Sequence, residues 1–512
     1  MTELIVHARW VVTGIADRNT PIVHDDAAVL SRDGIVVAVG PLAEMQALAP
    51  AATVKSYPNH VVMPGFVNSH HHVGMTPLQM GSPDYALELW FASRIPGRRL
   101  DLHLDTLYSA FEMIASGVTT VQHIHGWMPG GYEMIHGAAS KVLGAYRTIG
   151  MRASYCYAVR EQNRLVYQAD EEFCATLPKP LGEDLYKYLC DQKMPFEDFL
   201  KLFDVLTAEN AGERLTRVQL APANLHWVSD DGLQALAAKS KETGAPMHMH
   251  LLETAYQKEY AKRRTGKTAV RHLFDLGVLS PRMTLGHGVW LTAEDVDIAA
   301  ETGTCICHNC SSNFRLRSGI APLNAFEKKG ITVGMGLDEA GINDDRDMLQ
   351  ELRLVLRAHR VPGMDDDDVP SPSQVVRMAT EGGAKTTAFG DTIGRLDPGR
   401  FFDAVVIDWG KATYPYQDAD IPMLDALVQR AKAQAVDAVY IDGDLVYADG
   451  RFTRVDREGV LAEIADILAK PRTPEEVARR DLGRAVFPHV KAFYDGYLSE
   501  GATPFYGQSS RI

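Results

Sequence analysis

Short runs that alternate apolar and polar positions, separated by turn residues, occupy the first part of the chain. Runs of this kind at residues 4–13, 26–30 and 34–39 predict β-strands. Similar strand-like runs occur again at residues 399–408 and 435–443. Two strand-rich ends around a long middle predict a small β-sandwich domain formed from both chain ends, with residues 1–58 plus 395–455.

The middle of the chain repeats a different pattern, in which a short apolar run is followed by a helical one. Amphipathic segments such as residues 107–116, 231–243 and 292–301 lie between the runs. Alternation of strand and helix predicts a parallel sheet, and eight units predict an α/β fold with a (β/α)8 TIM-like barrel over residues 59–394. The eight runs are residues 61–67, 119–125, 152–159, 217–223, 246–251, 282–289, 303–308 and 332–337.

Residues 456–512 are predicted to be a C-terminal helical extension. Its apolar side chains recur at roughly helical spacing and form a stripe, made of Phe487, Val490, Phe493, Tyr494 and Tyr497. Two interpretations remain open for this stripe. It packs on its own barrel, or it packs on a second subunit.

Composition and charge narrow the class of protein. The chain has 512 residues, 46% of them hydrophobic, so it can bury a large core. Its formal net charge of −14 argues against a nucleic-acid partner and against an anionic membrane surface, because both require a basic face. Six cysteines are too few for a disulfide scaffold, and no long apolar segment is present. The prediction is a cytoplasmic protein without a membrane partner.

Polar side chains that can bind a metal fall at the ends of the predicted strands. His70 and His72 stand two residues apart on an extended segment, so both rings point the same way and can hold one ion. In a (β/α)8 barrel the C-terminal ends of the strands gather at one face. Imidazoles and a carboxylate there suit a divalent ion of the zinc or iron type. The candidates are His70, His72, His250, Glu253, His287 and Asp338.

Several segments together resemble the amidohydrolase superfamily, and within it the branch of cytosine, guanine and 8-oxoguanine deaminases and triazine hydrolases. They are residues 64–72, 250–254, 285–289, 308–313, 336–338 with 347–351, and 393–404. The resemblance runs from about residue 4 to about residue 455, and residues 456–512 lie outside it.

The resemblance implies a role for each candidate. His70, His72, His250 and Asp338 would be metal ligands. Glu253 would be the proton-shuttling acid, and His287 would contact the attacking water or the oxyanion formed from it. Asp338 can also take a proton from the water. No lysine follows the fourth strand, at residues 221–227, so one metal ion is expected, zinc with iron as the alternative.

Four further residues are candidates for substrate binding, each with a structural alternative. Trp90 would stack on a planar heterocycle, or anchor its loop. Arg160 would pair with a substrate carboxylate or carbonyl, or be a surface charge. His125 and His226 would line the pocket, or be structural.

A second zinc site is a minor hypothesis. Cys305, Cys307, His308 and Cys310 are metal ligands by type, but they lie on a strand that the resemblance implies to be buried.

Three functions compete at this point. The first is a metal-dependent hydrolytic deaminase of a small aminated heterocycle, such as a purine, pyrimidine, pterin or triazine. The second is a hydrolase of another C–N, C–Cl or C–S bond, and the third is a barrel that serves only as a scaffold. Deamination is favoured because Glu253 can protonate a ring nitrogen. The resemblance also implies a homo-oligomer, a dimer or a tetramer.

Overall fold

The computed structural model describes residues 2–17, 20–72, 74–126 and 128–499. In this part of the chain the middle forms two parallel four-stranded sheets, with helices between successive strands. The first sheet contains β5 (Phe66–His71), β6 (Val118–His125), β7 (Arg152–Tyr157) and β8 (Thr216–Val218). The second contains β9 (Met247–Leu251), β10 (Met283–His287), β11 (Cys305–His308) and β12 (Val333–Met335).

Single bridges connect the outer strands of these two sheets. Leu220, just beyond β8, pairs in parallel with Met247, and His71 pairs in parallel with Asp338. The backbone N–H of Asp338 donates to the carbonyl of His70 at 2.8 Å. The hydrogen-bonded ladder is not continuous at either seam, so the α/β class is confirmed whereas the closed barrel stays a prediction.

The parallel strands are buried on both faces. All eight residues of β6 and all five of β10 are buried, as expected for strands covered by helices on one side and by side chains on the other. Helix ends follow local capping rules. The Thr292 hydroxyl and the Asp295 carboxylate form a capping box at the start of α11, and Gly303 ends that helix in the left-handed region.

Both chain ends contribute to one eight-stranded sheet, in the order β16-β15-β14-β13-β4-β1-β2-β3. The strands form a single sheet, so the two facing sheets of a sandwich are not confirmed. The run at residues 61–67, predicted as one strand, is divided between β4 and β5, with Gly65 between them. The strands are β1 (Glu3–Ile15), β2 (Pro21–Arg32), β3 (Ile35–Pro41), β4 (Thr53–Pro64), β13 (Ala404–Asp408), β14 (Val436–Ile441), β15 (Asp444–Ala448) and β16 (Arg451–Phe452).

Arg152 links this sheet to the parallel strands. Its guanidinium is fully buried and binds the Asp403 carboxylate at 2.6 and 3.1 Å and Asp442 at 2.9 Å. Asp403 directly precedes β13, and Asp442 directly follows β14. One cation at the start of β7 therefore holds two late segments of the chain.

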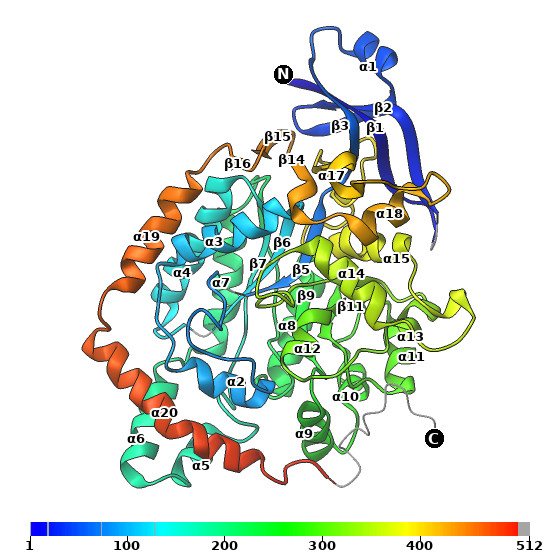
Figure 1. Cartoon of the computed structure of the whole chain (residues 1–512). Helices are drawn as coiled ribbons and strands as arrows, with labels where there is room; N and C mark the ends of the chain where they lie inside the picture. The colour runs from blue at the N-terminus through cyan, green and yellow to red at the C-terminus, as the bar shows by residue number, and fades with distance from the viewer. Residues whose placement is uncertain (1, 18–19, 73, 127, 500–512) are drawn as a thin grey trace.

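The described part of the C-terminal extension, residues 456–499, contains the helices α19 (Arg457–Ala469) and α20 (Pro474–Tyr494) and packs on its own chain. The apolar face of α20 is buried against α2, α5 and α6, with Val486, Val490, Tyr494 and Tyr497 in one hydrophobic cluster. In Figure 1, α20 runs past α2, α5 and α6 at the lower left. The own-chain interpretation of the stripe is therefore the one observed.

Helices cover the strands, and none of the described helices is long and apolar enough to cross a membrane. They are α1 (Leu42–Leu48), α2 (Leu87–Arg94), α3 (Leu102–Ala115), α4 (Tyr132–Ile149), α5 (Asp170–Ala175), α6 (Lys179–Cys190), α7 (Phe196–Glu209), α8 (Asp230–Thr243), α9 (Ala255–Thr265), α10 (Ala269–Asp275), α11 (Ala293–Thr302), α12 (Cys310–Arg315), α13 (Leu323–Lys328), α14 (Met348–Ala358), α15 (Pro372–Arg377), α16 (Gly383–Lys385), α17 (Trp409–Thr413), α18 (Met423–Arg430), α19 (Arg457–Ala469) and α20 (Pro474–Tyr494).

Candidate active site

The predicted metal ligands meet at the C-terminal ends of the parallel strands. His70 lies in β5 and His72 directly follows that strand, while His250 lies in β9 and Asp338 follows β12. Gly336 makes the close approach of β12 feasible, because a Cβ built there would lie 2.6 Å from the Cβ of His70. Residues far apart in the sequence are thus brought into one cluster.

The donor atoms of this cluster face one another. Nε2 of His72 lies 3.0 Å from Nε2 of His70 and 3.1 Å from Nε2 of His250. Oδ1 of Asp338 lies 3.2 Å from Nε2 of His72 and 3.6 Å from Nε2 of His70. In a tetrahedral zinc site with bonds of about 2.1 Å, neighbouring donor atoms lie about 3.4 Å apart. Spacing and donor type therefore both fit one divalent ion.

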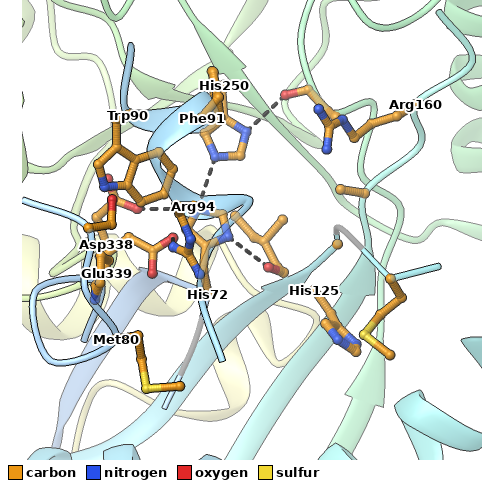
Figure 2. A pocket seen from close by; sticks show the side chains of 18 of the residues that line it. His72, Met80, Trp90, Phe91, Arg94, His125, Arg160, His250, Asp338 and Glu339 are labelled. Atoms are coloured by element: carbon orange, nitrogen blue, oxygen red, sulfur yellow. Dashed lines mark hydrogen bonds and ion pairs between the residues drawn. The ribbon is translucent and has the colours of Figure 1, made fainter. Parts of the chain in front are cut away.

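Backbone carbonyls orient two of the imidazoles. Nδ1 of His72 donates to the carbonyl of Ile124 at 2.7 Å, and Nδ1 of His250 donates to the carbonyl of Ala223 at 2.9 Å. These bonds place the ring proton on Nδ1, which leaves Nε2 as a lone-pair donor toward the cluster. Figure 2 shows both rings with these contacts.

His248 is a member of the site that the sequence prediction missed. Its Nε2 lies 2.8 Å from Nδ1 of His70, and its ring is buried. His248 and His250 stand two residues apart on β9, as His70 and His72 do at the end of β5, and this repeated spacing was the available signal. His248 fixes the orientation of a candidate ligand without being one itself.

Glu253 follows β9 and is almost fully buried, at 2% exposure. Burial raises the pKa of its carboxyl well above the usual range, and the carboxylates of Asp338 and Glu88 raise it further. Its Oε1 accepts a hydrogen bond from the Ser318 hydroxyl at 3.3 Å. Burial and the two neighbouring carboxylates therefore both favour the protonated form of Glu253.

The pKa of Asp338 is shifted in the opposite direction. Burial opposes ionisation, but the interactions of the Asp338 carboxylate with His72 and His287 and its hydrogen bond from Ser312 lower the pKa of Asp338 below its usual range. The Ser312 hydroxyl donates to its Oδ2 at 2.5 Å. The pKa values of two neighbouring carboxyl groups are thus shifted in opposite directions, a pattern typical of acid–base sites.

His287 lies between these two carboxyl groups. Its Nε2 is 3.5 Å from Oε2 of Glu253 and 3.9 Å from Oδ2 of Asp338, and its Nδ1 lies 3.0 Å from Oδ1 of Asn313. Both His287 and Asp338 have positive φ angles, of 71° and 54°. Left-handed conformations of non-glycine residues are strained and cluster at functional sites.

A cavity of about 290 Å³ opens onto this cluster. Its wall includes five residues of the predicted catalytic cluster, His72, His250, Glu253, His287 and Asp338. It also includes three of the four predicted substrate-binding residues, Trp90, His125 and Arg160. Figure 2 shows Trp90 and Arg160 on opposite sides of His72 and His250, with Asp338 on the side of Trp90.

Among these residues, Arg160 is not a surface charge, since it is only 7% exposed. His226 is absent from the cavity lining. Its ring is buried against Tyr167, at 4.5 Å between centroids, and Trp227, at 4.2 Å, so its placement supports the structural interpretation.

The cysteine hypothesis is only partly reproduced. Cys310 and His308 lie with His359, and one ligand atom of each falls within 4.8 Å of the others. Nε2 of His308 is 2.8 Å from Nε2 of His359, a contact that a hydrogen bond between two rings explains. Cys305 and Cys307 are buried, and neither belongs to a metal-binding group of the described residues.

Comparisons with known proteins agree with this geometry. A model of the amidohydrolase family matches residues 61–446. The 5-methylthioadenosine/S-adenosylhomocysteine deaminase of Nitratidesulfovibrio vulgaris is 28% identical over 470 residues, which cover 91% of this chain and 97% of the relative.

Two solved structures share the fold. An adenosine deaminase from Xanthomonas campestris with bound zinc has a TM-score of 0.74 at 22% identity, covering 95% of this chain and 99% of that one. A triazine hydrolase from Arthrobacter aurescens has a TM-score of 0.76 at 20% identity, covering 92% and 100%. The resemblance inferred from the sequence segments is confirmed.

Proposed function

This chain belongs to the amidohydrolase family, and from that premise we propose that it is a metal-dependent hydrolytic deaminase of an adenine-type purine. The observation that carries the proposal is the buried carboxylic acid of Glu253, which faces the same cavity as the ligand cluster. Its proton is the one that a ring nitrogen needs when an amino group is displaced. The deaminase relative supports the choice of an adenine ring.

We assign His70, His72, His250 and Asp338 as the residues that would hold one divalent metal ion, zinc with iron as the alternative. Three imidazoles and a carboxylate suit either metal. When bound, such an ion lowers the pKa of water toward about 7 and so supplies a nucleophile at neutral pH.

The remaining chemistry belongs to the side chains of this chain. Glu253 gives its proton to the ring nitrogen next to the carbon that is attacked. His287, through Nε2, contacts the attacking oxygen and stabilises the charge that develops on it. Asp338 holds the first proton that the oxygen loses and passes it to the amino group, which leaves as ammonia when the C–N bond breaks. The second proton of the oxygen returns to Glu253 as the C=O bond forms. Trp90 stacks on the ring, with Arg94 above its indole at 4.6 Å.

The architecture around the site supports a barrel that works as one unit. We propose that residues 59–394 form the (β/α)8 catalytic domain, residues 1–58 plus 395–455 the composite β domain, and residues 456–512 the extension. The bridges at Leu220 and His71 support closure of the barrel. A cytoplasmic location and a homo-oligomeric state are proposals from composition and family resemblance alone.

A screen of the metal-loaded protein tests the function. The panel contains adenosine, guanine, cytosine, a pterin and a chlorinated triazine, and ammonia and chloride are both measured. We expect ammonia from the adenine compound, about one zinc or iron per chain by elemental analysis, and loss of activity after chelation. Chloride release without ammonia would move the assignment to displacement of other leaving groups. A metal-loaded protein inactive on the whole panel would refute the proposal.

A further inference from the structure

Arginines line the cavity in unusual number. Five of them, Arg94, Arg98, Arg99, Arg160 and Arg479, form part of its wall. The lining also contains four carboxylates, two of which, Glu253 and Asp338, belong to the catalytic cluster. The other two are engaged locally. Glu339 pairs with Arg94 at 2.9 Å, and Asp105 accepts the backbone N–H groups of Gly74 and Met75.

Three of these arginines, Arg99, Arg160 and Arg479, line the same cavity as the phenol of Tyr188. Burial raises the pKa of Tyr188, and the positive charges of Arg99, Arg479 and Arg160 act against that rise. The three arginines come from the loop after α2, from α20 and from the segment after β7, so the fold brings together charges that are distant in sequence.

Two of the three arginines are held in the wall rather than in solvent. Arg160 and Arg479 are 7% and 8% exposed. Arg160 lies over the Trp227 ring at 4.0 Å, and Nη2 of Arg479 donates to the carbonyl of Gly97 at 2.7 Å. Other arginines lie near both guanidinium groups. Burial and then Arg99 lower the pKa of Arg479, while burial and then Arg164 lower that of Arg160 to about 9.

Two acidic residues of α20, Glu475 and Glu476, interact with the arginines of this region, including Arg479. Glu476 lies 3.6 Å from Arg98, and Glu475 lies 4.0 Å from the half-exposed Arg99. Neither glutamate lines the cavity. An anion inside the cavity would therefore meet the arginines without touching either glutamate.

The C-terminal extension places Arg479 in the cavity. Gly483, one helical turn further along the same face of α20, packs against the loop after α2, where a Cβ would lie 2.6 Å from Cδ of Pro96. This close contact holds α20 against the segment that carries Arg99. The matched region of the family model ends at residue 446, so Arg479 belongs to a part of the chain beyond it.

We infer that Arg99, Arg160 and Arg479 form a subsite for an anionic group, a carboxylate or a phosphate, carried by the substrate at a distance from the amino group that is removed. The inference rests on the proposed function, whose substrate it narrows to an anionic derivative of the heterocycle. Guanidinium groups bind both kinds of anion through two parallel hydrogen bonds, which lysines cannot do.

The first test needs no turnover. Full-length protein is treated with phenylglyoxal, and modification of Arg99 is followed by mass spectrometry in acetate, in phosphate and in chloride at equal ionic strength. We expect acetate or phosphate to slow modification of Arg99 relative to chloride, and the Arg479→Gln substitution to abolish this protection. Arg480, which is paired with Asp481 on the neighbouring face of α20, serves as the internal control. Equal rates in all three salts would overturn the subsite.

The second test compares substrates. KM is measured for S-adenosylhomocysteine, which carries a carboxylate, for 5′-adenylate, which carries a phosphate, and for uncharged adenosine. In the Arg479→Gln variant we expect the ratio of anionic to neutral KM to rise by about 10- to 100-fold for the anion that the subsite accepts, the effect of losing one charged hydrogen bond. The matched variant Arg480→Gln should leave the ratio unchanged.

The two tests separate the inference from the function on which it rests. A rise in KM that is equal for charged and uncharged compounds would overturn the inference, because α20 would then act only on cavity shape. If no adenine compound releases ammonia, the proposed function fails for this ring, and the protection experiment still decides whether the anion subsite exists.

Discussion

Replacing Glu253 with Gln separates proton transfer from every other property of this carboxyl. Gln has nearly the same size, and its carbonyl can still accept the hydrogen bond that the Ser318 hydroxyl donates at 3.3 Å. The variant therefore loses the transferable proton and keeps the packing.

The expected loss follows from that single change. A positioned general acid or base contributes about 10² to 10⁴ in rate, so the barrier should rise by about 3 to 5 kcal/mol. Glu253 donates to no candidate ligand, so the metal content should stay at the wild-type value.

The assay measures kcat from ammonia release on the substrate found in the screen, with elemental analysis of the same preparation. Two variants serve as controls. Ser318→Ala keeps the carboxylic acid and should lose much less activity. Asp338→Asn removes a candidate ligand as well as a base, so metal content and rate should both fall, and added metal should not restore the rate fully. A Glu253→Gln variant that turns over at close to the wild-type rate would refute the proton-transfer role and favour displacement of a group, such as chloride, that needs no proton.

Two further predictions concern stability. Arg152→Met should lower the free energy of unfolding by about 3 to 5 kcal/mol, because it leaves the buried Asp403 carboxylate without its cation, and an unchanged urea midpoint would contradict this. Burial raises the pKa of Glu351 to about 7 from 4.5, so the folded state holds its proton more tightly than the unfolded state does. That stabilisation is complete below pH 4.5 and is lost as pH rises through 7. From pH 5 to pH 8, the free energy of unfolding of Glu351→Gln should therefore rise by up to about 3 kcal/mol relative to that of the wild type. A difference in urea midpoint between the two proteins that is the same at pH 5 and at pH 8 would contradict this prediction.

The clustering of the candidate metal ligands could be predicted from sequence because the rules that place them are local or topological. Alternation along a strand puts His70 and His72 on one side, and strands that run parallel bring their C-terminal ends to one face. His250 and Asp338 fall at such ends, and the structure brings their donor atoms together.

Where apolar and polar residues do not alternate, the sequence could not show where one strand ends and the next begins. Residues 61–67 read as one strand, yet β4 ends at Pro64 in the terminal sheet and β5 begins at Phe66 among the parallel strands. Both strands are buried on both faces here, so hydrophobicity alone carries no mark of the boundary.

The tail shows what the sequence determined by itself and what it left open. An apolar stripe at helical spacing predicts a helix with one buried face, because the spacing depends only on local geometry. The surface that this face covers depends on long-range packing, which decided that α20 lies against α2 and that Arg479 enters the cavity wall. The same holds for His248, whose contact with His70 joins residues 178 positions apart. Such contacts follow from the three-dimensional positions of strands and helices. The spacing of His248 and His250 could mark His248 as a candidate, but it could not show which residue His248 contacts.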